Sequence, residues 1–118
     1  MKTILLDTNF LIEALKRRID VASQLERAFE DGFTPVVLKE QLAEIERLGP
    51  LEARAATTVI DALGIRVEEG GKTDVDDAIL AYAKKSGAAV ATGDEGLKKR
   101  LKKAGVEIIT LSNRMLRP

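Results

Sequence analysis

The sequence has 118 residues and no formal net charge at pH 7, because 19 lysines and arginines balance 19 aspartates and glutamates. This length fits a single domain. The chain contains no cysteine and no histidine, which excludes disulfides, thiol catalysis, Ser-His-Asp hydrolysis and the usual zinc sites. Balanced charge provides no global field for nucleic acid, so any such binding requires a local basic patch.

Hydropathy argues against a membrane protein. No apolar run approaches the roughly 20 residues that span a bilayer, and the apolar stretch near the N-terminus is too short for a signal peptide. We therefore expect a cytoplasmic protein with no membrane partner. Charged residues make up 32% of the chain, a content compatible with a thermophilic source.

The first third of the chain alternates between strand-like and helix-like spacing of apolar residues. A short apolar run predicts a strand over residues 3–6. Thr8 or Asn9 then caps a helix whose apolar face holds Phe10, Leu11, Ala14 and Leu15. A second helix is expected from Asp20 to Gly32, and a second strand over residues 34–37.

The remainder continues the alternation. Leu42, Ile45 and Leu48 are expected on the inner face of a helix over residues 38–48. Thr73 is expected to cap a later helix, with Asp76 as its capping partner and Gly87 at its end. The other predicted elements are a helix over 51–63, a strand over 65–68, a strand over 88–92, a helix over 95–103 and a strand over 106–111, followed by a tail, 112–118, without a pattern.

Strands that alternate with helices predict a parallel sheet with right-handed crossovers. The expected fold class is therefore α/β, a three-layer α/β/α sandwich around a central parallel sheet. The whole chain, 1–118, is expected to form one domain with its core in about residues 1–111 and a short C-terminal tail.

Two aspartates directly follow predicted strands. Asp7 comes after the first strand, and Asp94 comes shortly after the strand over 88–92. In an open parallel sheet, residues just beyond the carboxyl ends of the strands line the ligand crevice. Each aspartate has an alternative role as the cap of the helix that follows it. Both roles place the two carboxylates at the same edge of the sheet.

Three further positions are acidic candidates. Asp76 and Asp77 lie in the first turn of one helix, about 100° apart around its axis. We favour Asp77 as the residue that faces the crevice, with Asp76 as a capping partner that assists. Glu44 flanks the buried face of the helix over 38–48, and Glu40 lies one turn earlier on the same side. Spacing alone leaves open which glutamate faces the crevice.

Carboxylates gathered without histidine or cysteine favour hard divalent cations such as Mg²⁺ or Mn²⁺. Several carboxylates within a few ångströms repel one another, and a divalent cation removes that repulsion. Two such ions about 4 Å apart would clamp the attacking and leaving oxygens of a phosphodiester. The pattern thus indicates phosphoryl chemistry that needs no imidazole base.

A strongly basic helix follows Asp94 and favours a nucleic-acid substrate. Its cations would hold a phosphate backbone without reading sequence. The alternative is an ordinary solvated helix face. The residues concerned are Lys98, Lys99, Arg100, Lys102 and Lys103.

The chain resembles the PIN-domain ribonuclease family in four strings that occur in the family's order: LLDTNFLIEAL, LAEIERLG, TDVDDAILAYA and VATGDEGLKKRLKKAGVEIITL. The resemblance implies Mg²⁺- or Mn²⁺-dependent ribonuclease activity. It assigns catalysis and metal binding to Asp7, Glu44, Asp77 and Asp94, with Asp76 as a helper, and so favours Glu44 over Glu40. It also implies that Thr8, Asn9 and Thr92 hold the carboxylates by hydrogen bonds.

Two subgroups of that family fit the sequence. One is the VapC-type toxin, in which an antitoxin protein blocks the site, and the other is the Fcf1-like group of ribosomal RNA processing. A catalytically inactive PIN-like module that binds RNA or protein is a further alternative, and a response-regulator receiver is disfavoured because Asp7 stands alone. Excess apolar residues in the helices over 20–32 and 51–63 predict a homodimer.

Overall fold

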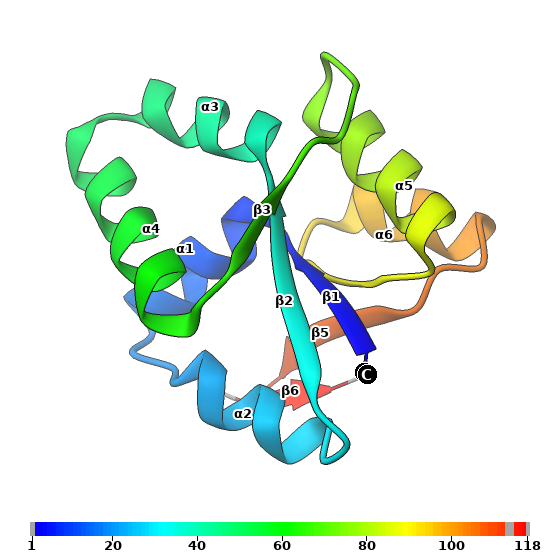
Figure 1. Cartoon of the computed structure of the whole chain (residues 1–118), viewed down its shortest axis with the longest axis horizontal. Coiled ribbons are helices and arrows are strands. Elements are labelled where there is room, and N and C mark those ends of the chain that lie inside the picture. The colour runs from blue at the N-terminus through cyan, green and yellow to red at the C-terminus, as the bar shows by residue number, and fades with distance from the viewer. Residues whose placement is uncertain (1, 113–114, 118) are drawn as a thin grey trace.

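A six-stranded sheet forms the centre of the computed structural model, which describes residues 2–112 and 115–117 and the side chains of 2–14 and 16–110 (Figure 1). In spatial order the strands run β3-β2-β1-β4-β5-β6. β6 pairs antiparallel with β5, and the other neighbouring strands are parallel. The strands are β1 (Lys2–Leu6), β2 (Phe33–Leu38), β3 (Arg66–Glu68), β4 (Ala89–Ala91), β5 (Ile108–Ser112) and β6 (Met115–Arg117).

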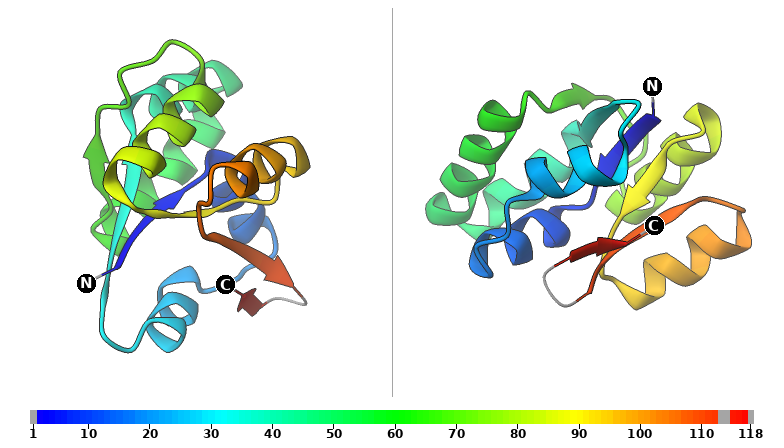
Figure 2. Two further views of the ribbon diagram at one scale, coloured as in Figure 1. Left: turned by 90° about the vertical axis from the view of Figure 1, so that its right-hand side faces the viewer. Right: turned by 90° about the horizontal axis from the view of Figure 1, so that it is seen from below.

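Helices cover both faces of this sheet. Side chains alternate along β1, so that Ile4 and Leu6 pack against helices α1 to α4, whereas Leu5 packs against α5 and α6. The right-hand view of Figure 2 shows the strands between these two groups of helices. The predicted three-layer α/β/α architecture is confirmed. The helices are α1 (Thr8–Lys16), α2 (Val21–Ala28), α3 (Lys39–Leu48), α4 (Pro50–Leu63), α5 (Val75–Ser86) and α6 (Glu95–Lys103).

The start of α5 differs from the prediction. Asp74, not Thr73, caps this helix, and its Oδ1 accepts the N–H of Asp77 over 2.9 Å. Asp76 is therefore not the capping partner of Thr73. Gly87 ends the helix in the left-handed conformation, as predicted.

Two other helix predictions also need correction. Asp20 caps α2 as expected, but the helix ends at Ala28, with Phe29 as its C-cap, before it reaches Gly32. Leu48 is 52% exposed, because Gly49 ends α3 immediately after it and the chain turns away into α4. The predicted inward face of α1 includes Leu15, which lies outside the described side chains.

The chain changes direction across the sheet at β1. From β1 it runs outward to β2 and β3, and then returns to place β4 on the other side of β1. The carboxyl ends of β1 and β4 therefore meet at a topological switch point, where open α/β sheets bind ligands. The C-terminal segment, in which the sequence shows no pattern, contains β6, which contacts α2. In the described part of the chain, no helix is long and apolar enough to cross a membrane.

Candidate metal-dependent phosphodiester site

Asp7 lies at the switch point, between β1 and α1, with its backbone N–H bonded to the carbonyl of Ala91 at the end of β4. The residue is only 5% exposed. Its Oδ2 accepts a 2.7 Å hydrogen bond from the hydroxyl of Thr92, and the same hydroxyl oxygen accepts the N–H of Asp94 over 3.1 Å. Thr92 thus links the two acidic residues that follow β1 and β4.

Burial raises the pKa of the Asp7 carboxyl from its ordinary 3.8 to about 6. The hydrogen bond from Thr92 opposes this shift, whereas the nearby carboxylates of Asp76 and Asp94 add to it. Asp7 is therefore mostly ionised at pH 7 but gains a proton on mild acidification, which a nearby cation would oppose. Perturbation of this kind is common at functional sites.

Asp94 combines two roles that the sequence left as alternatives. Its Oδ1 caps α6 by accepting the N–H of Leu97 over 2.9 Å. Its carboxylate also lies close enough to Asp7 and Asp76 to raise the pKa of both. Capping fixes the position of the carboxylate and leaves it beside Asp7 and Asp76. We call the edge of the sheet that carries Asp7, Asp76, Asp94 and Glu44 the acidic edge.

Asp76 lies near several other acidic residues. Burial, followed by the carboxylates of Asp94 and Asp74, raises the pKa of Asp76. Asp76 in turn raises the pKa of Asp7 and of Glu44. The two neighbours thus have different surroundings, and the assignment of Asp77 as the residue that faces the crevice stays a prediction.

Asp77 points toward α6. Its side chain is half-exposed, and its Oδ1 lies 2.6 Å from Nη2 of Arg100. The sequence held a signal for this arrangement, because Asp76 is three, four and seven residues before Ile79, Leu80 and Ala83 and so heads the buried stripe of α5. Asp77 is displaced by about 100° from that stripe.

The structure also separates Glu44 from Glu40. Burial and the carboxylate of Asp76 raise the pKa of Glu44, which is partly buried. Glu40 instead accepts the N–H groups of Gly70 over 3.0 Å and Lys72 over 3.2 Å. Burial would raise the pKa of Glu40, but these backbone N–H groups outweigh it and the pKa is lowered. Glu44 therefore belongs to the acidic edge, and Glu40 fastens the loop between β3 and α5.

Gly70 permits this loop to approach so closely. A Cβ at this position would lie 2.7 Å from both Glu40 Oε2 and the Cβ of Ala78. The contact between the loop and the start of α5, near Asp76, thus depends on the absence of a side chain.

Gln41 is a residue of the site that the sequence analysis missed. It is completely buried. Its Nε2 donates to the carbonyl of Leu6 over 2.8 Å and to the hydroxyl of Thr8 over 3.4 Å, and its Oε1 accepts the N–H of Leu38 over 2.7 Å. One amide thus joins the end of β1 to the end of β2, beside Asp7. A search restricted to ionisable residues overlooks it, although its place on the same stripe as Ile45 was a usable signal.

The predicted supporting and basic residues take different places. Thr8 is buried, whereas Asn9 is exposed and lines a cavity next to Asp94. Lys98 lines the same cavity and pairs with Glu95. The other predicted backbone-binding cations, Lys99, Arg100, Lys102 and Lys103, are exposed on α6, and Arg100 is the one that pairs with Asp77.

The donor set of the acidic edge fits a hard divalent cation. Asp7, Glu44, Asp76 and Asp94 offer carboxylate oxygens alone, the ligands that Mg²⁺ and Mn²⁺ prefer. Among the described residues, no three acidic side chains lie close enough together to hold an ion in this arrangement. The charges of Asp76 and Asp94 raise the pKa of Asp7, and the charge of Asp76 raises that of Glu44, so a bound cation would relieve repulsion at this edge.

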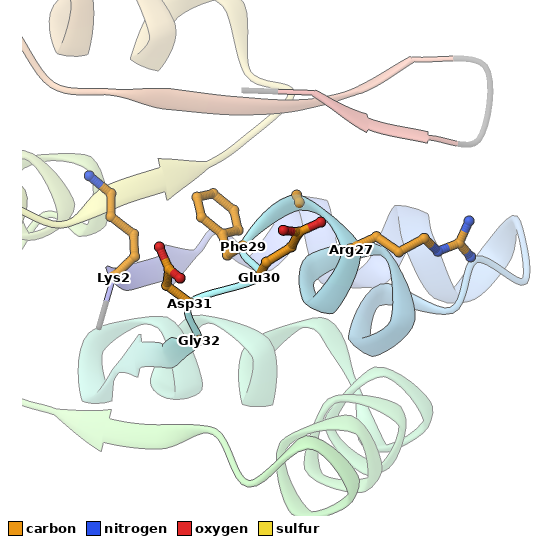
Figure 3. Close-up of a pocket in the computed structure, with 7 residues that line it drawn as sticks. Lys2, Arg27, Phe29, Glu30, Asp31 and Gly32 are labelled. Atoms are coloured by element: carbon orange, nitrogen blue, oxygen red, sulfur yellow. The ribbon is translucent and has the colours of Figure 1, made fainter.

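A second cavity, of about 650 Å³ compared with about 360 Å³ for the cavity next to Asp94, lies at the opposite end of the sheet. Lys2, at the start of β1, lines it together with residues at the end of α2 and in the loop before β2 (Figure 3). Lys2 is already paired with Glu107 over 2.8 Å. Because the acidic edge follows the carboxyl end of β1, this cavity is separate from it.

Comparison with known proteins agrees with the fold. The chain is 32% identical to Ribonuclease VapC4 of Methanocaldococcus jannaschii, over 94% of this chain and 91% of that protein. Its structure resembles that of the PIN domain endonuclease Utp24 with a TM-score of 0.86 and 27% identity, over 98% of this chain and 89% of the other.

A likeness in fold alone extends to VapBC2 from Rickettsia felis bound to a DNA fragment from its promoter, with a TM-score of 0.65 and 12% identity over 92% of this chain and 98% of the other. The profile of the family described as "PIN like domain" matches residues 4–114. The chain therefore belongs to the PIN-like domain family.

Proposed function

We propose that this protein is a divalent-metal-dependent ribonuclease that hydrolyses phosphodiester bonds within an RNA strand. The observation that carries the proposal is the pairing of Asp7 and Asp94 through the Thr92 hydroxyl at the switch point of the sheet, with Asp76 near enough to raise the pKa of Asp7 and Glu44. Similarity to Ribonuclease VapC4 and to the endonuclease Utp24 supports the same chemistry.

Asp7, Asp76, Asp94 and Glu44 would hold Mg²⁺ or Mn²⁺, which when bound supplies charge stabilisation for phosphodiester hydrolysis. Thr92 fixes the carboxylate of Asp7 by its hydrogen bond, and Gln41 fixes the strand end that carries Asp7. The capping bond to Leu97 holds Asp94. Residues that are held in this way lose little freedom when they bind a cation and substrate.

The basic residues of α6 would bind the RNA backbone. Lys98, Lys99, Arg100, Lys102 and Lys103 lie on the helix that Asp94 caps, with Lys98 one turn from Asp94 and the others extending along the helix away from it. Contacts of this kind position a strand without reading its sequence.

Within the family, the proposed role is the toxin of a VapC-type pair that an antitoxin protein neutralises. The relative named Ribonuclease VapC4 supports this role. The second candidate is an Fcf1-like nuclease of ribosomal RNA processing, and the likeness to the PIN domain endonuclease Utp24, with a TM-score of 0.86, supports a nuclease in either role. Expression in a bacterial host separates the two, since a free toxin arrests growth and a nuclease confined to one precursor RNA does not.

We also propose that the protein forms a homodimer. Leu48 and Leu51 are exposed large apolar side chains at the corner between α3 and α4. Burying this corner against a second copy would remove it from water. Sedimentation of the wild type and of Leu51→Lys tests this, and an unchanged dimer in the variant excludes the corner as the interface.

The test of the function is cleavage of a labelled single-stranded RNA with Mg²⁺, Mn²⁺ or EDTA. Asp7→Asn and Asp94→Asn should abolish metal-dependent cleavage, whereas Asp61→Asn, at an exposed position in α4, should cleave normally. Cleavage that survives both substitutions means that the site is elsewhere. No cleavage of several RNAs with either metal would favour a binding module.

A further inference from the structure

A groove runs from the acidic edge along α1. Asn9, Glu13 and Arg17, each four residues from the next, line one wall, and Asp94 and Lys98, again four residues apart, line the other. Residues with this spacing stack along one helix face, so the walls are the facing sides of α1 and α6. The cavity measures about 360 Å³. We call it the α1–α6 groove.

The groove begins at the candidate metal site and ends at the positively charged side chain of Arg17. Asp94 and Asn9 stand at the end next to the acidic edge, and Arg17 lies about 12 Å further along α1 at 1.5 Å per residue. Arg17 follows the last residue of α1, and its N–H still bonds to the carbonyl of Glu13, which continues the helical turn. The positive charge of the wall therefore lies beyond the carboxylates, on a path that leads out from them.

The two cations of the groove are held by weak ion pairs. Arg17 Nε lies 2.8 Å from Glu13 Oε1, and Lys98 Nζ lies 3.3 Å from Glu95 Oε1. The Arg17 and Glu13 side chains are half-exposed, and ion pairs of that kind contribute little. A phosphate that offers a bidentate contact to the guanidinium competes well with such a carboxylate. The Lys98 side chain is 19% exposed, so its stem is packed into the wall.

We propose that the α1–α6 groove binds the backbone of the RNA strand immediately beside the bond that is cleaved, with Lys98 and Arg17 on successive phosphates. This inference rests on the proposed ribonuclease function and adds the path of its substrate. The ligand is backbone and not base, because Phe10, the aromatic residue of the groove, is buried and offers no ring face for stacking. Binding in the groove is therefore independent of sequence.

The structure supplies matched controls on the same helix end. Lys16 and Arg18 flank Arg17, carry the same charge and are exposed, but they do not line the groove. In the Asp7→Asn background with Mg²⁺, we expect Arg17→Gln and Lys98→Gln each to weaken binding of a fluorescent single-stranded RNA about tenfold. Lys16→Gln and Arg18→Gln should change the dissociation constant less than twofold.

Salt dependence gives a second readout. Each lost phosphate contact should reduce the slope of log K against log salt by about 0.7. An RNA with one neutral methylphosphonate at the phosphate assigned to Arg17, the further of the two from the cleaved bond, should bind as weakly as Arg17→Gln binds normal RNA, and the two changes together should not add. The proposal that RNA binds in the groove would be wrong if Arg17→Gln and Lys16→Gln weakened RNA binding equally. It would also be wrong if the effects of Arg17→Gln and the methylphosphonate on binding were fully additive.

Failure of the groove can be distinguished from failure of the function. If the wild type cleaves RNA and Asp7→Asn binds it, but Arg17→Gln behaves like its controls, only the groove is wrong. If no metal supports cleavage and no RNA binds, the ribonuclease proposal fails and the groove fails with it. Arg17 is exposed, so Arg17→Gln should melt at the wild-type temperature.

Discussion

The hydroxyl of Thr92 donates a 2.7 Å hydrogen bond to Asp7 Oδ2, although the two residues are 85 positions apart in the chain. The same oxygen accepts the N–H of Asp94. One buried side chain thus sets the orientation of the residue that follows β1 and the start of the loop that follows β4. The acidic edge depends on this contact as much as on the carboxylates themselves.

Thr92→Val keeps the shape of the side chain and removes its hydroxyl. Because the Asp7 carboxyl loses its donor in a buried position, the free energy of unfolding should fall by about 1–3 kcal/mol. Metal-dependent cleavage should fall with it, since Asp7 is no longer held in one orientation. Urea denaturation and an RNA cleavage assay measure the two effects. Thr92→Ser, which keeps the hydroxyl, should restore most of both, and an unimpaired Thr92→Val would contradict this role.

Asp76 and Asp77 are adjacent but should respond differently to the same substitution. Asp76→Asn removes the carboxylate that interacts with Asp7, Glu44 and Asp94, so metal-dependent cleavage should be lost. Asp77→Asn breaks an exposed ion pair with Arg100, which should change stability by less than about 1 kcal/mol and leave most of the cleavage. Cleavage rates of the two variants at saturating Mn²⁺ test this. The reverse result would support Asp77 as the metal ligand.

The raised pKa of Asp7 predicts how stability changes with pH. Because its pKa is about 6 in the folded protein and 3.8 ordinarily, the folded state binds more protons between these values. The free energy of unfolding contributed by Asp7 should therefore decrease as the pH rises from about 4 to 6, by up to about 3 kcal/mol in total.

Asp7→Asn lacks this titration. In EDTA, the stability of Asp7→Asn relative to the wild type should increase over that pH range and then level off. Urea denaturation at a series of pH values measures the difference, with Asp61→Asn as a surface control that should show no such trend. A constant difference between Asp7→Asn and the wild type would mean that Asp7 is ionised throughout.

Gln41→Met tests the buried amide beside the site. The substitution leaves the carbonyl of Leu6 and the N–H of Leu38 without their partner, so the free energy of unfolding should fall by about 2 kcal/mol. Mn²⁺ binding, followed by calorimetry, should weaken as well, because the ends of β1 and β2 are no longer joined. Leu25→Ala is the matched control, since it destabilises the core from α2 and should leave Mn²⁺ affinity unchanged. Equal affinities in both variants would reduce Gln41 to a purely structural residue.

Sequence periodicity was sufficient for the architecture. Every predicted strand and helix exists, because buried strands and amphipathic helices leave different apolar spacings. Helix ends were less predictable. Thr73 and Asp74 are both residue types that cap helices well. Which of them caps α5 depends on where the extended backbone gives way to the helix, and this happens after Asp74.

The candidate site was predictable where a residue directly followed a strand. Asp7 directly follows β1 and Asp94 comes shortly after β4, and the strand order places both residues at one edge of the sheet. Asp76 and Gln41 were harder because their roles depend on which way a helix face turns, and a rotation of one residue moves a side chain by about 100°. Gln41 was also hard to predict because its side chain is neutral and acts through three hydrogen bonds, not through charge.

The pairing of β1 with β4 has a consequence for folding during synthesis of the protein. During synthesis the first strand leaves the ribosome well before the fourth, and N-terminal segments are available to fold first. Until β4 inserts beside β1, Asp7 has neither the hydroxyl of Thr92 nor the carboxylate of Asp94 next to it. A nascent chain that ends before β4 therefore carries an incomplete site, which is assembled only after most of the chain has been translated.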